Sequence, residues 1–173
     1  MRYNIYLGFD KKTEADINDL RFELYENFPH VPRLSKMPPH LSLLVFDNDD
    51  QNSVIEAFNK AAEYLLPFDV ELNEIGSFCR RRGNVLFIKP DVPRNLKAYQ
   101  EDLVLLSSSG STVLSAFFGW KPHVTLVKGW KGKKFLEAEK YAMKKWKPVK
   151  GRLTFLGLIN VRKPLDILAS KNL

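Results

Sequence analysis

Two of the three histidines in this chain sit in the same five-residue pattern. Residues 39–43 read Pro-His-Leu-Ser-Leu, and residues 122–126 read Pro-His-Val-Thr-Leu. Each copy opens an apolar run, which is typical of the start of a β-strand. Residues two apart in a strand share one face, so each copy would present an imidazole beside a hydroxyl. The four polar residues are His40, Ser42, His123 and Thr125.

This pairing of imidazole and hydroxyl predicts acid–base chemistry on a phosphate. Histidine can give or take a proton near neutral pH, because its unperturbed pKa is about 6.5. Of two histidines facing one substrate, one can deprotonate the nucleophile while the other protonates the leaving oxygen. The hydroxyls can donate hydrogen bonds to the non-bridging oxygens as charge develops. The third histidine, His30, lies among prolines, and we expect it to be a surface or packing residue.

The strands and helices that must position these residues follow from the spacing of apolar side chains. In the first motif strand, alternation places Leu41, Leu43 and Val45 on the face opposite His40. Thr13 is a good N-cap for the first helix. Strands are predicted at residues 3–9, 40–46, 68–75, 85–88, 123–127 and 149–161, with a short edge strand at 165–169, and helices at 13–28, 54–65, 96–106 and 135–146.

The two halves of the chain repeat one order of features: motif, turn, helix, proline, strand and glycine. Pro67 precedes Gly76 by nine positions, and Pro148 precedes Gly157 by nine positions. This repeat predicts two similar lobes related by a pseudo-twofold axis, with both motifs facing one cleft. At this length we expect residues 1–173 to form a single bilobal domain.

Composition excludes several classes of protein. Hydrophobic residues make up 45% and charged residues 27% of the chain, and no apolar run approaches the roughly 20 residues that span a bilayer. Cys79 is the only cysteine, so an internal disulfide is excluded and a zinc site is not predicted. The first residues lack the layout of a signal peptide. We therefore expect a cytoplasmic monomer that does not bind membranes.

Charge is distributed unevenly along the chain, whose net charge is +7. Residues 47–75 contain eight acidic residues and one lysine, a net charge of −7, whereas residues 121–150 contain ten lysines and two glutamates, a net charge of +8. These segments are either two solvated faces or, for the basic one, a surface that attracts a phosphate chain. The chain shows neither a carboxylate cluster for magnesium nor a Gly-rich phosphate loop, so we expect no cofactor and no metal.

The two motifs resemble the paired His-x-Ser/Thr signatures of the two-histidine (2H) phosphoesterase superfamily, which includes 2′-5′ RNA ligase-like proteins and cyclic nucleotide phosphodiesterases. The resemblance implies an α+β bilobal fold, with two antiparallel sheets flanking a central cleft and helices outside. It implies that the four motif residues form the active site, with His123 activating water and His40 protonating the leaving group. By the same resemblance Tyr6 lines the cleft, unless it only packs in the core.

Three further features suit a nucleic-acid ligand, and each also has a plainer interpretation. Arg81, in the loop Arg80-Arg81-Arg82, could bind a substrate phosphate, or the loop could be a solvated hairpin tip. Trp120 and Trp130 could stack on bases or pack against the sheet.

The resemblance implies a metal-independent phosphoesterase that hydrolyses, or reversibly forms, 2′,3′-cyclic phosphate or 2′-5′ phosphodiester bonds. Its substrates would be RNA ends or small cyclic nucleotides, or a small molecule such as a cyclic ADP-ribose phosphate. The alternative is a non-catalytic module that binds a nucleotide or RNA in the same cleft.

Overall fold

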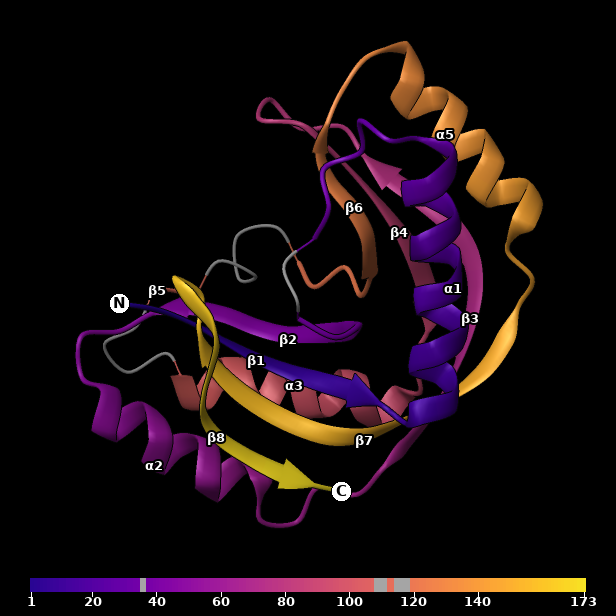
Figure 1. Cartoon of the computed structure of the whole chain (residues 1–173). Coiled ribbons are helices and arrows are strands. Elements are labelled where there is room, and N and C mark those ends of the chain that lie inside the picture. The colour runs from indigo at the N-terminus through magenta and orange to yellow at the C-terminus, as the bar shows by residue number, and fades with distance from the viewer. Residues whose placement is uncertain (35–36, 108–111, 114–118) are drawn as a thin grey trace.

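A computed structural model describes residues 1–34, 37–107, 112–113 and 119–173 (Figure 1). Apart from a two-residue strand at residues 112–113, which was not predicted, the order of elements matches the predicted alternation of strands and helices, and the α+β class is confirmed. The elements are β1 (Arg2–Phe9), α1 (Lys11–Asn27), β2 (His40–Asp47), α2 (Gln51–Ala62), β3 (Phe68–Phe78), β4 (Asn84–Asp91), α3 (Arg94–Ser107), β5 (Thr112–Val113), β6 (Val124–Trp130), α5 (Lys133–Lys145), β7 (Val149–Asn160) and β8 (Lys163–Asn172).

The two predicted sheets are joined into one antiparallel sheet with the strand order β5-β2-β1-β7-β3-β4-β6, and β8 pairs with β7. The joint lies where residues 68–72 of β3 pair with residues 149–153 of β7. Beyond the joint β7 continues beside β1, whereas β3 continues beside β4. Figure 1 shows the two halves of this sheet set at an angle to each other. The two lobes are therefore two arms of one bent sheet: one arm consists of β5, β2, β1, β7 and β8, and the other of β3, β4 and β6.

Helices α1 and α3 cross from one arm to the other. Helix α1 follows β1 in the chain and contacts β6 as well as β1 and β7, and α3 follows β4 but contacts β2. Helix α5 packs on β3, and α2 packs on β7 and β8. Each motif strand is therefore supported by a helix that leaves the opposite arm.

Helix α1 begins earlier than the sequence pattern predicts. Its N-cap is Asp10 rather than Thr13, and the Asp10 carboxylate accepts hydrogen bonds from the backbone N–H groups of Lys12 and Thr13, each at 3.0 Å. The Thr13 hydroxyl donates to the same carboxylate at 2.6 Å. The carboxylate directly after β1 is a better-placed acceptor, so Thr13 becomes part of the first turn.

Both motif strands contain a β-bulge at the same position of the motif. Tyr6 pairs with Ser42 while Ile5 pairs with Leu44, which leaves Leu43 as the extra residue. In the other arm Phe87 pairs with Thr125 and Leu86 pairs with Val127, which leaves Leu126 extra. A bulge reverses the alternation of faces beyond it. The prediction for Val45 was therefore wrong: Leu44 is buried and Val45 is only partly buried.

Candidate active site

The bend of the sheet brings the two motif strands together. β2 and β6 lie far apart in the strand order, yet they contact each other without pairing. His40 opens β2, and His123 lies directly before β6, which begins one residue later than predicted. Both imidazoles are partly buried; burial is the main cause that lowers the pKa of His40, and the charge of His123 lowers it further. The contact between β2 and β6 therefore brings the two predicted histidines to the same part of the molecule.

The two histidines make the same hydrogen bond. Nδ1 of His40 lies 2.9 Å from the carbonyl oxygen of Pro38, and Nδ1 of His123 lies 2.8 Å from the carbonyl oxygen of Lys121. A carbonyl only accepts, so each Nδ1 must carry the proton. Nε2 is then the basic nitrogen in the neutral ring, and in the described part of the chain it has no partner. Both rings are thus held in the tautomer that suits proton exchange through Nε2.

Ser42 and Thr125 each belong to a set of three residues that pair across three neighbouring strands of one arm. In one arm the set is Gly157, Tyr6 and Ser42, and in the other it is Gly76, Phe87 and Thr125. A Cβ on Gly157 would lie 2.6 Å from the Tyr6 ring, and one on Gly76 would lie 2.8 Å from the Phe87 ring. Gly157 and Gly76, the glycines of the sequence repeat, therefore leave the space that the Tyr6 and Phe87 rings occupy.

The aromatic residue of each set contacts the histidine of its own arm. The Tyr6 and His40 rings meet edge to face with centroids 5.3 Å apart, and the Phe87 and His123 centroids are 5.5 Å apart. Tyr6 is 3% exposed, and burial raises the pKa of its hydroxyl. Tyr6 is therefore a core side chain that also contacts His40, and its place in a substrate cleft stays a prediction.

Burial lowers the pKa of both histidines. The pKa of His40 falls to about 4, chiefly through burial, with further contributions from the charges of Arg21, His123 and Lys128. The pKa of His123 is also lowered, mainly by burial and then by the charge of Arg80. Both rings are therefore neutral at neutral pH in the free protein, and an anion bound between them would favour their protonation.

Side chains from other elements hold the motif strands. Asn4 donates from Nδ2 to the Ser42 hydroxyl oxygen at 3.0 Å, and Trp120 donates from Nε1 to the Ser42 carbonyl at 3.0 Å. Arg21 of α1 donates from Nη2 to the Thr125 carbonyl at 2.6 Å. The sequence analysis missed Asn4 and Arg21. Arg21 lies four positions after Ile17, so helical spacing places it on the apolar face of α1. A charged residue on that face was the feature that could have identified it.

In the arginine loop, Arg80 lies beside a ring that contacts His123, and the binding of a substrate phosphate by Arg81 stays a prediction. The guanidinium of Arg80 lies over the Phe78 ring, 5.3 Å from its centroid, and Phe78 meets the His123 ring at 5.2 Å. Arg81 is exposed, and its carbonyl accepts a hydrogen bond from Lys131. Arg80 is thus the member of the loop that lies next to His123, because alternation along β3 and its turn directs it toward Phe78.

The two tryptophans have structural partners. Trp130 is 9% exposed and packs against Phe28 and Phe135, so packing is the correct interpretation for this residue. Trp120 is partly buried, and its ring nitrogen is engaged with Ser42.

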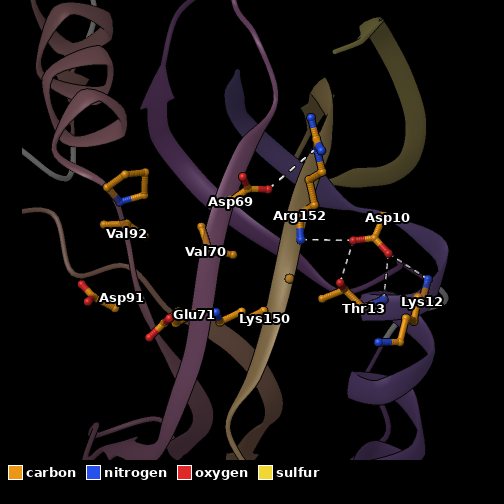
Figure 2. Close-up of a pocket in the computed structure, with 12 residues that line it drawn as sticks. Asp10, Lys12, Thr13, Asp69, Val70, Glu71, Asp91, Val92, Lys150 and Arg152 are labelled. Atoms are coloured by element: carbon orange, nitrogen blue, oxygen red, sulfur yellow. Dashed lines mark hydrogen bonds and ion pairs between the residues drawn. The ribbon is translucent and has the colours of Figure 1, made fainter.

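A separate pocket of about 590 Å³ lies at the start of α1, beside β3 and β7 (Figure 2). Some of its polar groups interact with one another. Asp10 accepts hydrogen bonds from Thr13 and from the backbone N–H of Arg152, and the Arg152 side chain lies 3.8 Å from the Asp69 carboxylate. None of the motif residues lines this pocket, so it does not form part of the candidate active site.

The described residues contain no group of three or more His, Cys, Asp or Glu side chains arranged to hold a metal ion. Within the same part of the chain, every helix is too short or too polar to cross a bilayer.

Comparisons with known proteins agree with this architecture. Solved structures that match over nearly the whole chain include Escherichia coli LigT complexed with 3′-AMP, with 17% identity, a TM-score of 0.64, and coverage of 99% of this chain and 96% of that one. The protein TT0787 of Thermus thermophilus matches with 16% identity, a TM-score of 0.68, and coverage of 100% and 98%. A structure described as a phosphoesterase matches with 16% identity, a TM-score of 0.60, and coverage of 99% and 98%. These likenesses establish the fold.

Among curated protein sequences none matches this chain significantly. The sequence model of the 2′-5′ RNA ligase superfamily, in contrast, matches residues 9–164 and so includes both motifs. On this match the chain belongs to the 2′-5′ RNA ligase superfamily of two-histidine phosphoesterases.

Proposed function

We propose that this protein is a metal-independent phosphoesterase that opens 2′,3′-cyclic phosphates, or cleaves and reversibly forms 2′-5′ phosphodiester bonds. Residues 1–173 act as one catalytic unit, with His40, Ser42, His123 and Thr125 at its centre. The observation that carries the proposal is the matched pair of imidazoles, each donating from Nδ1 to a backbone carbonyl and each keeping Nε2 available.

In the proposed reaction, neutral His123 takes a proton from water through Nε2 as the water oxygen attacks phosphorus. The bond between phosphorus and the ribose oxygen breaks, and protonated His40 gives its proton to that oxygen. Ser42 and Thr125 donate hydrogen bonds to the non-bridging oxygens, where charge develops. The low pKa of free His40 fits this role only when substrate is bound, because the phosphate anion favours the charged imidazole.

Basic side chains next to the second motif favour RNA ends over small cyclic nucleotides as substrates. Arg80, Lys121 and Lys128 are exposed, and none of them forms an ion pair with a described residue. Unpaired cations along one edge of a site suit successive phosphates of a strand. LigT structures have been solved with 3′-AMP, ATP and NADP+, which supports a nucleotide at the equivalent place.

The test uses purified protein treated with EDTA and a panel of 2′,3′-cyclic mononucleotides, RNAs ending in a cyclic phosphate, and 2′-5′ linked oligonucleotides. We expect turnover of at least one class, and His40→Ala or His123→Ala should each lower kcat by about 100-fold or more. His30→Ala, which changes an exposed histidine, is the matched control. Tight RNA binding without any product would favour the non-catalytic binding module instead.

A further inference from the structure

Arg21 is a buried cation without a carboxylate partner. Its side chain is 6% exposed, Nη2 donates to the Thr125 carbonyl, and Nη1 donates to the Asn18 side chain at 3.3 Å. Nε is buried with no hydrogen-bond partner. Glu14 attracts the guanidinium, but Arg21 forms no ion pair with any described residue. Burial of a charge is costly unless an opposite charge compensates for it, so this position calls for an explanation.

In the other arm, a neutral side chain, that of Gln100, holds the motif strand in the same way. Gln100 of α3 is 4% exposed and donates from Nε2 to the Leu43 carbonyl at 3.3 Å. Gln100 binds the carbonyl of Leu43, the bulge residue of β2. Arg21 binds the carbonyl of Thr125, which directly precedes Leu126, the bulge residue of β6. A neutral amide therefore suffices to tie a crossing helix to a motif strand. The charge of Arg21 is not needed for anchoring.

The charge of Arg21 acts on His40. Thr125 is the motif hydroxyl residue of the second arm, so the guanidinium lies directly behind the site. Consistent with that position, the Arg21 charge contributes to lowering the pKa of His40. A positive charge that opposes protonation of an imidazole also attracts an anion placed beside it. In the free protein this charge has no ion-pair partner among the described residues, and a bound phosphate would supply an opposite charge.

We propose that Arg21 is a positioning residue with two roles: it holds the backbone of Thr125, and it supplies the permanent positive charge that draws the substrate phosphate between the two motifs. This inference rests on the proposed phosphoesterase function, because it assumes that a phosphate binds there.

The experiment compares Arg21→Gln, which keeps an amide donor like that of Gln100 but removes the charge, with Arg21→Lys, which keeps the charge. Arg2→Gln is the charge-matched control, because Arg2 forms an exposed ion pair with Asp47. Three quantities are measured for each protein: Tm without phosphate, the Kd for inorganic phosphate by calorimetry, and kcat/KM on the best substrate of the panel.

We expect Arg21→Gln to be as stable as the wild type without phosphate, since the cost of an uncompensated charge is removed. Its phosphate affinity and kcat/KM should fall on the order of tenfold, the size expected for one buried charge acting on the site. Arg21→Lys should stay within about threefold of the wild type, and Arg2→Gln should be unchanged.

Unchanged phosphate affinity and kcat/KM in Arg21→Gln, with or without a lower Tm, would overturn the proposal and leave Arg21 a structural anchor. If Arg21→Gln does not fold, Arg21→Lys decides: retained affinity supports the proposal, and a tenfold loss of affinity at an unchanged Tm refutes the role of the charge. Failure of the proposed function gives a different result, because the wild type would then turn over none of the substrates, whether or not it binds phosphate.

Discussion

Replacing His40 by glutamine should make the protein more resistant to acid. In the folded protein the pKa of His40 is lowered from 6.5 to about 4, chiefly by burial. Between these values the unfolded chain binds a proton that the folded protein does not. The free energy of unfolding therefore falls as the pH decreases from about 6.5 to about 4, and no further loss from this group occurs below that range.

The size of the effect follows from the same two pKa values. Integrated across the window, the loss is about 3 kcal/mol at most. Glutamine has no charge to gain, but its amide nitrogen takes the place of Nε2 and not of Nδ1, so the hydrogen bond to the Pro38 carbonyl is lost at every pH. Relative to the difference between wild type and His40→Gln at pH 7, the variant should therefore be about 2–3 kcal/mol more stable at pH 4.

The assay is urea unfolding followed by tryptophan fluorescence at several pH values between 4 and 7.5, with unfolding free energies obtained by linear extrapolation. His30→Gln changes an exposed histidine and should reproduce the wild-type pH dependence. If the stability difference between wild type and His40→Gln were the same at pH 4.5 and pH 7, burial would not suppress protonation of His40, and the electrostatic description of the site would be wrong.

Three further expectations follow from the geometry. Gly157→Ala should lower the free energy of unfolding by about 1–3 kcal/mol in urea titrations, because the new methyl group would overlap the Tyr6 ring; a variant as stable as the wild type would show that the ring is free to move. Trp120→Phe removes the donor to the Ser42 carbonyl and should lower kcat several-fold with little change in KM in steady-state assays, whereas an unchanged kcat would exclude a positioning role for that bond. The pH dependence of kcat/KM should show its maximum below pH 6.5, because one imidazole must be protonated while burial lowers the pKa of both His40 and His123; a maximum above pH 7 would contradict this.

Much of the fold could be predicted because it depends on local patterns. Period-two and period-3.6 spacing of apolar residues identified the order of strands and helices. The doubled motif identified the candidate site, since a histidine and a hydroxyl two positions apart must share a strand face. The nine-residue spacing from proline to glycine identified the repeat, and its glycines lie under the aromatic rings of the two arms.

The tertiary structure decided what local patterns cannot encode. Alternation along one strand does not reveal where its neighbour inserts a bulge, so the burial of Leu44 in place of Val45 depended on the register with β1. The crossing of α1 and α3 between the arms depends on contacts distant in sequence, and it alone made Arg21 a neighbour of Thr125. The sequence thus determined which chemical groups are present and in what local order. Which of these groups meet was determined by the bend of the shared sheet. That bend depends on the pairing of β3 with β7, two strands that lie far apart in the chain.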